Sequence, residues 1–246
     1  MDLVYVVGGP AENDREDLRY SLRSFAKNYQ GPAFRDVWVV GDVPDWFTGA
    51  RLPLPPHPEK FQNQRASLTA YVECAGAAAS FVLANDDMFL IEPIDGPLPI
   101  VRASAETGIQ YATVHRNFSR YGRCVPSCYQ CQVSETAVWT VDRLGHDAPI
   151  YEAHSPLLFD TGRLREVLAE YPEGRPFAVG EVYPIAGLGG EGVVAGNAKV
   201  RRNDAATLAK KLGNPMPYLS CSPESWAGVV GSYVKPLFTE PSPWEA

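Results

Sequence analysis

The chain has 246 residues, of which 45% are hydrophobic and 21% are charged, and its formal net charge is -7. This apolar content supports a packed core and excludes a disordered chain. The acidic charge disfavours non-specific binding to nucleic acid but does not exclude a nucleic-acid partner. No apolar run has the length of a membrane span and no secretion signal is recognisable, so we expect a cytoplasmic protein with a single domain over residues 1–246.

The first third of the chain alternates between short apolar runs and segments in which apolar residues have helical spacing. In chain order, these segments lie at 3–7 (strand), 14–29 (helix), 37–40 (strand), 64–79 (helix) and 80–83 (strand). A proline-rich stretch at 53–58 is predicted to be a loop. The alternating order predicts an α/β fold with a doubly wound, mainly parallel sheet and helices on both faces.

The second half of the sequence has weaker patterns. Residues 92–152 are expected to form a loop-rich insertion that contains three of the five cysteines. Two short β-like runs lie inside it, at 110–114 and 137–141. Helical patterns return at 161–171, 204–212 and 224–238.

Two adjacent carboxylates follow the third predicted strand. They are Asp86 and Asp87, and Asn85 precedes them. Parallel α/β sheets bind their ligands at the carboxyl ends of the strands. Because neighbouring carboxylates repel each other, a bound Mg²⁺ or Mn²⁺ would relieve the repulsion and also bind substrate phosphates. The sequence therefore predicts a metal and phosphate site here. The alternative is a solvated turn, for which Asn-Asp-Asp is equally suitable.

Other residues are candidates for the same site, and each has an ordinary structural alternative. Gly8 follows the first strand and would let a nucleotide approach the backbone, or it is a simple turn residue. His154 is a candidate general base or phosphate ligand, or a partly buried loop histidine. Arg19 and Arg23 lie one helical turn apart, where acidic residues of the same helix offer ordinary ion pairs. Arg175 would bind a phosphate, or it is a surface arginine.

A cysteine cluster inside the insertion indicates a separate kind of site. Cys124, Cys128 and Cys131, with His115 upstream, supply four ligands that suit a tetrahedral structural zinc ion. The spacing is not one of the usual paired zinc motifs. The alternative is three thiols that bind no metal.

Six short motifs occur in a fixed order along the chain. They are Asp-Leu-Val-Tyr-Val-Val at 2–7, Glu-Asp-Leu-Arg-Tyr-Ser-Leu-Arg-Ser at 16–24, the segment with Val-Trp-Val-Val-Gly-Asp at 36–46, Phe-Val-Leu-Ala-Asn-Asp-Asp-Met-Phe at 81–89, Ala-His-Ser-Pro at 153–156 and Phe-Thr-Glu-Pro-Ser-Pro-Trp-Glu at 238–245. This series resembles the Stealth family, bacterial capsule-type hexose-phosphate transferases that are related to the animal N-acetylglucosamine phosphotransferase.

The resemblance implies a nucleotide-sugar-transferase-like sheet and a metal-dependent transfer of a sugar phosphate from a UDP-sugar to a hydroxyl of a glycan. It implies that Asp86 and Asp87 bind Mg²⁺ or Mn²⁺ and the diphosphate. Asp87, His154 and Arg175 become the expected catalytic residues. The residues expected to line the nucleotide-sugar site are Gly8 and, from the resemblance, also Arg19, Ser21, Arg23, Asn63 and Asn85.

One departure from the family leaves two other functions open. Residues 221–224 read Cys-Ser-Pro-Glu where the family has Cys-x-Asn-Asp, so one Asn-Asp pair is missing. The first alternative is a glycosyltransferase that moves the sugar itself to a glycan, a protein or a modified nucleic-acid base and releases UDP instead of UMP. The second is a non-catalytic carbohydrate-binding protein, which would release neither nucleotide.

Overall fold

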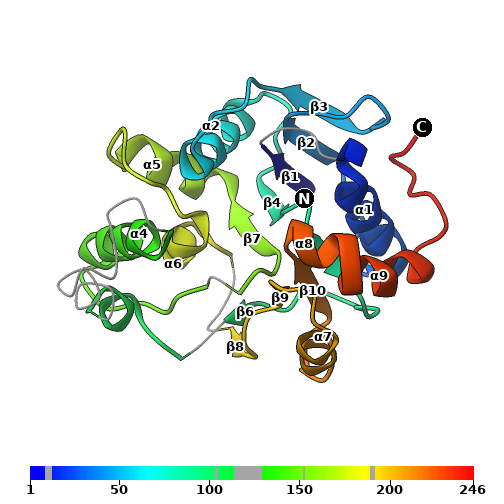
Figure 1. The fold of residues 1–246 in the computed structure, drawn as a ribbon. Helices are drawn as coiled ribbons and strands as arrows, with labels where there is room; N and C mark the ends of the chain where they lie inside the picture. Colours follow the sequence, from blue (N-terminus) through cyan, green and yellow to red (C-terminus); the bar gives the residue numbers. More distant parts are fainter. Residues whose placement is uncertain (9–12, 103–104, 114–128, 152, 189–191) are drawn as a thin grey trace.

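A mainly parallel sheet forms the centre of the molecule (Figure 1). The computed structural model describes the chain except for residues 9–12, 103–104, 114–128, 152 and 189–191. Within the described residues, this sheet has five strands in the order β3-β2-β1-β4-β7. Their bounds are β1 (Asp2–Val7), β2 (Val37–Gly41), β3 (Ala50–Pro53), β4 (Ser80–Ala84) and β7 (Leu157–Asp160). The first four are parallel, and β7 pairs antiparallel with β4, which confirms the predicted α/β class.

The strand order reverses direction at β1. The chain moves outward from β1 to β2 and β3, and then returns to place β4 on the other side of β1. Such a reversal separates the connections that leave two neighbouring strands and opens a crevice beyond their carboxyl ends. The fold therefore predicts a ligand site where β1 and β4 end.

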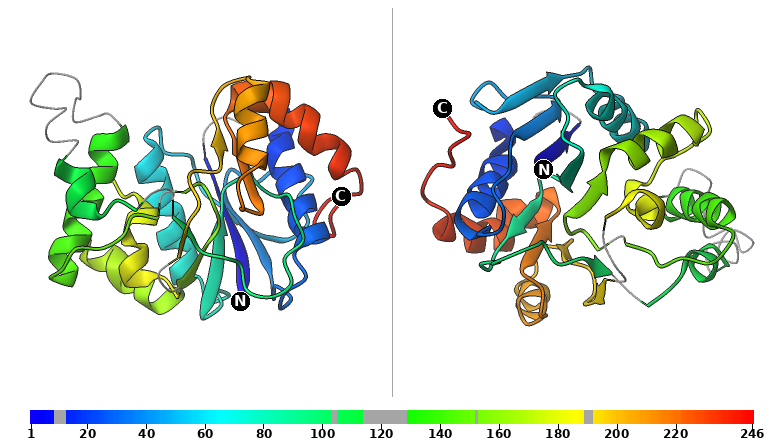
Figure 2. Two further views of the ribbon diagram at one scale, coloured as in Figure 1. Left: turned by 90° about the horizontal axis from the view of Figure 1, so that it is seen from below. Right: turned by 180° about the vertical axis from the view of Figure 1, so that it is seen from behind.

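Both faces of the sheet are covered by helices, because side chains on successive strand residues point to opposite faces. On β1, Leu3, Tyr5 and Val7 contribute to one buried cluster and Val4 to another. The first cluster includes the apolar stripe of α1, and the second includes side chains of α2 and α5. In the left view of Figure 2, the two groups of helices lie on either side of the sheet. The bounds are α1 (Glu16–Asn28), α2 (Lys60–Glu73) and α5 (Thr161–Glu170).

A second, smaller sheet continues directly from the end of β4. Its strands are β5 (Met88–Leu90), β10 (Tyr218–Cys221) and β9 (Lys199–Val200), and they lie in the order β5-β10-β9. The connection between β4 and β5 is Asn85-Asp86-Asp87, so these three residues lie at the junction of the two sheets. A two-stranded sheet pairs β6 (Val101–Arg102) with β8 (Val193–Val194).

Further helices and turns cover the rest of the sheets and the region around them. They are α4 (Tyr129–Leu144), α6 (Tyr183–Ala186), α7 (Ala205–Leu212), α8 (Pro223–Ser225), a π-helical turn (Trp226–Val230), α9 (Gly231–Leu237) and 3₁₀ turns at Asn13–Arg15 and Val179–Val182. Among the described residues, no helix is both long and apolar enough to cross a membrane.

Both β-like runs predicted within residues 92–152 are wrong. The β-like run at 137–141 lies inside helix α4, and residues 110–113 are also helical, while residue 114 lies outside the described residues. In α4, Val133, Ala137 and Thr140 are buried at helical spacing, so packing overrides the strand preference of the Ala-Val-Trp-Thr-Val run. The proline-rich stretch also contributes Pro53 to β3, an edge strand, where proline is tolerated.

Candidate functional site

A pocket of ≈ 280 Å³ lies at the crevice between the ends of β1 and β4. We call it the carboxylate pocket, and its lining includes Gly8, Asn63, Asn85, Asp86 and Asp87. All five are residues that the sequence predicted for the nucleotide-sugar site. The backbone explains one close approach: a Cβ at Gly8 would overlap the side-chain nitrogen of Asn63, so glycine lets these two segments meet.

Asp87 is paired with a lysine from the second sheet. Its Oδ2 lies 2.7 Å from Nζ of Lys199 on β9, and both side chains are largely buried. The backbone oxygen of Asp87 accepts a hydrogen bond from the N–H of Cys221 on β10, which fixes the turn against this sheet. The other carboxylate oxygen, Oδ1, is buried and accepts no hydrogen bond from any group that the structure describes. Asp87 thus presents an acceptor whose partner is missing.

Arg15 connects three strand ends around the same pocket. Its guanidinium donates to Oδ2 of Asp42, which follows β2, at 2.8 Å, and to the backbone oxygen of Gly8, which follows β1, at 3.4 Å. It also forms an ion pair at 3.7 Å with Oδ2 of Asp86, which follows β4. The side chain of Arg15 is buried, so its charge acts on these groups with little screening by water.

Negative charge gathers at this end of the sheet. The pKa of Asp86 is raised to about 7, mainly by burial and also by the charges of Asp17 and Asp87, while Arg15 and Lys199 act in the opposite direction. Burial also raises the pKa of Asp17, in the first turn of α1, and the charge of Asp87 adds to that shift. Three carboxylates that disfavour one another's ionised form would be stabilised by an added cation.

The donor set fits a hard divalent cation. Mg²⁺ and Mn²⁺ prefer oxygen ligands, and Mg²⁺ commonly uses one or two carboxylates together with substrate phosphates and water. Asp86 and Asp87 supply the carboxylates, and the unsatisfied Oδ1 of Asp87 is an atom that a cation would satisfy. No cluster of three or more His, Cys, Asp or Glu side chains suited to a metal occurs in the described part of the chain. A metal at Asp86 and Asp87 would therefore complete its ligand shell with phosphate oxygens or water.

His154 lines a second pocket beside the first. The two pockets share Lys60, Gln64 and Asn85 in their linings. His154 adopts a left-handed backbone conformation with φ 50°. The pKa of His154 is lowered to about 3, mainly by burial and also by the charge of Lys199, while the charge of Asp87 acts in the opposite direction. The imidazole is therefore neutral at neutral pH, so it does not act as a cation that binds phosphate, and a pKa this low makes it a weak proton acceptor without a nearby negative charge.

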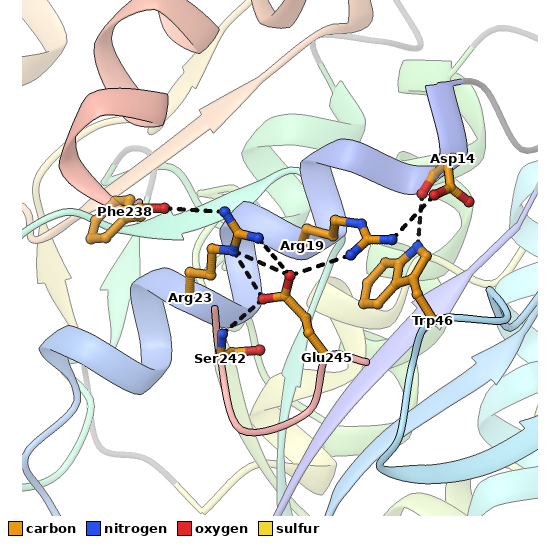
Figure 3. A network of polar contacts seen from close by, with 7 residues as sticks. All are labelled: Asp14, Arg19, Arg23, Trp46, Phe238, Ser242 and Glu245. Atoms are coloured by element: carbon orange, nitrogen blue, oxygen red, sulfur yellow. Dashed lines mark hydrogen bonds and ion pairs between the residues drawn. The ribbon is translucent and has the colours of Figure 1, made fainter. Parts of the chain in front are cut away.

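Arg19, Ser21 and Arg23, predicted for the nucleotide-sugar site, do not line the carboxylate pocket, and the structure does not bring them together with Asp86 and Asp87. Figure 3 shows the two arginines pointing toward Glu245 in the C-terminal segment, where Arg23 Nη2 lies 2.7 Å from Oε2. Arg19 also stacks on the indole ring of Trp46, 4.1 Å from its centroid. Ser21 is buried and bonds Tyr5 Oη and the backbone oxygen of Met88. These side chains hold the C-terminal segment and β5 on α1.

Glu245→Gln is expected to reduce the free energy of unfolding at neutral pH by about 1–2 kcal/mol, because charge-assisted hydrogen bonds from partly exposed arginines are lost. Burial raises the pKa of Glu245, but the hydrogen bonds from Arg23 and the N–H of Ser242 outweigh it and hold the pKa below the ordinary value. A lowered pKa in the folded state stabilises the protein above the unfolded value, about 4.3. The difference from wild type should therefore be full at neutral pH and vanish as the pH falls below about 4.

Urea unfolding at several pH values measures this difference, and the exposed Glu240→Gln is the matched control. The control should match wild type at every pH. A Glu245→Gln difference that persists unchanged in acid would show that packing of the segment, and not the charge of Glu245, stabilises it.

The remaining predicted site residues are Arg175 and the expected zinc ligands. Arg175 is exposed, forms an ion pair with Glu135 of α4 at 3.2 Å and lines neither pocket, so the structure does not place it with Asp87 and His154. Of the expected zinc ligands, His115, Cys124 and Cys128 lie outside the described residues. Cys131, in the first turn of α4, is in a disulfide, a form in which its sulfur is not a thiolate ligand. The zinc site stays a prediction.

Sequence reasoning missed five charged residues of the site: Arg15, Asp17, Asp42, Lys60 and Lys199. Asp42 could have been found, because it follows a parallel strand just as Asp86 does. Asp17 looks like an ordinary acidic residue in the first turn of a helix. Lys199 lies in a two-residue strand that has no periodicity to read. Arg15 precedes α1 in a left-handed conformation that no sequence pattern indicates.

A scan against protein-family models and a search of curated proteins found no match to this chain.

Proposed function

We propose that the protein transfers a sugar phosphate from a UDP-sugar to a hydroxyl of a glycan, in the cytoplasm and with Mg²⁺ or Mn²⁺. The observation that carries the proposal is the carboxylate pair Asp86 and Asp87 in a pocket at the reversal point of a parallel sheet. The resemblance of six sequence motifs to the Stealth family supports the same reaction class.

In the proposed reaction, the acceptor oxygen attacks the phosphorus atom that carries the sugar. A new phosphorus–oxygen bond forms, the bond from this phosphorus to the diphosphate's bridging oxygen breaks, and UMP leaves with the electron pair. The imidazole of His154, neutral in the protein alone, takes the proton of the acceptor hydroxyl, and the negative charge of the bound diphosphate would raise its pKa toward the range of a general base. Lys199 and Arg15 provide fixed positive charge near the phosphates, which stabilises the charge that develops on their oxygens. A metal ion bound by Asp86 and Asp87 would add further charge stabilisation.

The nucleotide product separates this reaction from the first alternative. We expect UMP when the protein is incubated with a panel of UDP-sugars, Mn²⁺ and a mixture of glycan acceptors, followed by chromatography of the nucleotides. Release of UDP would instead identify a glycosyltransferase that breaks the sugar carbon–oxygen bond, since the same fold and metal site serve both reactions. Failure to bind any UDP-sugar in calorimetry, with or without Mn²⁺, would favour the carbohydrate-binding alternative.

A further inference from the structure

A second pocket beside the carboxylate pocket has features of a carbohydrate site. We call it the aromatic pocket, and its lining includes Phe61, Tyr129, Tyr151, His154, Ser155 and Glu181. It adjoins the carboxylate pocket through the shared residues Lys60, Gln64 and Asn85. A group bound in one pocket would therefore lie next to a group bound in the other.

Two buried polar groups face this pocket. Ser155 is 4% exposed, and its Oγ has no hydrogen-bond partner among the groups that the structure describes. Glu181, on the 3₁₀ turn Val179–Val182, is 3% exposed. A buried hydroxyl without a partner is costly, and a ligand hydroxyl would remove that cost. A carboxylate beside it accepts hydrogen bonds and donates none when ionised, so the pair suits a ligand that carries several O–H groups.

The walls of the pocket are aromatic rings held in place by other rings. Phe61 stacks on Tyr129, with centroids 5.5 Å apart and ring planes at 24°. Tyr151 packs against Tyr183 at 4.7 Å. Rings in such pairs offer rigid apolar surface. A hexose ring presents C–H groups to an apolar wall and hydroxyls to polar groups at its edge, which matches this combination of rings and buried oxygens.

The two pockets differ in charge and therefore favour different ligands. The aromatic pocket has Glu181 and the shared cation Lys60 in its lining, so these two charges offset each other, whereas the carboxylate pocket also has Lys199 and Arg15 beside its paired acids. His154 lines the aromatic pocket, and a general base must lie within reach of the hydroxyl that it deprotonates. A neutral sugar that carries the attacking hydroxyl is therefore the ligand that suits the aromatic pocket.

We infer that the aromatic pocket binds a hexose unit of the acceptor glycan, with Glu181 and Ser155 as hydrogen-bond partners of its hydroxyls. This inference rests on the proposed function, because it assigns the acceptor to the pocket that adjoins the phosphate site. It also assigns the donor to the carboxylate pocket, where Gly8 allows close approach to the backbone.

The test is a binding experiment that requires no turnover. Saturation-transfer NMR is recorded with methyl glycosides of neutral hexoses, first with the protein alone and then with UDP-sugar present. At least one hexoside should bind, and UDP-sugar should not displace it. Glu181→Gln should weaken its binding about tenfold, the loss expected for one hydrogen bond to a charged group. Ser155→Ala, a milder change, should weaken it in the same direction, and Glu166→Gln on the exposed face of α5 should not.

Three results would overturn the assignment: no hexoside binds, Glu181→Gln binds as well as wild type while retaining its circular dichroism spectrum and melting temperature, or UDP-sugar displaces the hexoside. The last result would make the pocket the site of the donor sugar. Failure of the proposed function gives a different pattern, because the hexoside would still bind and still depend on Glu181 while neither UMP nor UDP is released.

Discussion

Asp87→Asn is expected to lower kcat for UDP-sugar turnover by about 10²- to 10³-fold, the loss typical of removing one preorganised charge-stabilising group from an active site. The substitution keeps the size of the side chain and one carbonyl oxygen for Lys199. It removes the negative charge with which Asp87, together with Asp86, would bind the proposed metal ion. The measurement is the rate of UMP release at saturating UDP-sugar and Mn²⁺, and we expect the melting temperature to stay close to that of wild type.

Two control variants separate the roles of this carboxylate. Lys199→Met removes the ion-pair partner of Asp87 and leaves both carboxylates of the turn in place. Mn²⁺ affinity, measured by electron paramagnetic resonance, should fall in Asp87→Asn. It should be retained in Lys199→Met, because that variant keeps both carboxylates and loses only the ammonium group that competes with Mn²⁺ for Asp87. Asp45→Asn, at a fully exposed aspartate, controls for the loss of one negative charge and should change neither quantity.

The metal assignment fails if Asp87→Asn and Lys199→Met lose the same activity and neither changes Mn²⁺ affinity. The pair would then act as a charge pair that positions β5 against β9. If Asp87→Asn is as active as wild type, the active site lies elsewhere. No other pair of adjacent carboxylates in the described residues follows a strand of the parallel sheet, so no second pair could take over the role of Asp86 and Asp87.

Three strands of the central sheet, β1, β2 and β4, were predictable because they and the helices between them carry strong local signals, whereas the outer strands β3 and β7 were not predicted. The β-branched run at β1 and the spacing of Leu18, Leu22 and Phe25 on α1 each specify one element, and their alternation specifies parallel pairing. The position of Asp86 and Asp87 at a strand end then follows, since parallel sheets collect their carboxyl ends at one edge.

The remainder of the site depends on contacts that join distant parts of the chain. Lys199 reaches Asp87 only because β9 pairs with β10 and β10 pairs with β5, and pairing between two- to four-residue strands leaves no periodic signal. Arg19 and Arg23 show the reverse case, in which the sequence pattern indicated a site residue and the structure shows a contact with the C-terminal segment instead. Their spacing is compatible with a phosphate site or with ion pairs, and the partner that decides, Glu245, is known only once the C-terminal segment is placed on α1.

The opposite end of the sheet, where the parallel strands begin, provides the second large effect: Asp2→Ala is expected to lower the free energy of unfolding by about 3 kcal/mol. Asp2 is fully buried at the start of β1. Its carboxylate accepts hydrogen bonds from Arg35 Nε (3.0 Å) and Nη2 (2.8 Å), Trp38 Nε1 (3.0 Å), Tyr71 Oη (2.9 Å) and the N–H of Ala78 (3.1 Å). Truncation leaves these donors without their acceptor, and a buried donor that loses its partner costs more than the bond itself contributed. Urea unfolding followed by circular dichroism measures the change.

Asp36→Ala is the matched control for this network, because Asp36 pairs with the same Arg35 at 3.0 Å but is about half exposed. A surface ion pair contributes little, so this variant should change stability by less than about 0.5 kcal/mol. Asp2 lies at the amino end of β1 and the carboxylate pocket lies beyond its carboxyl end, so the folded Asp2→Ala protein should keep the Mn²⁺ affinity of wild type. Equal losses of stability in Asp2→Ala and Asp36→Ala would show that negative charge near Arg35, and not the buried acceptor, stabilises this end of the sheet.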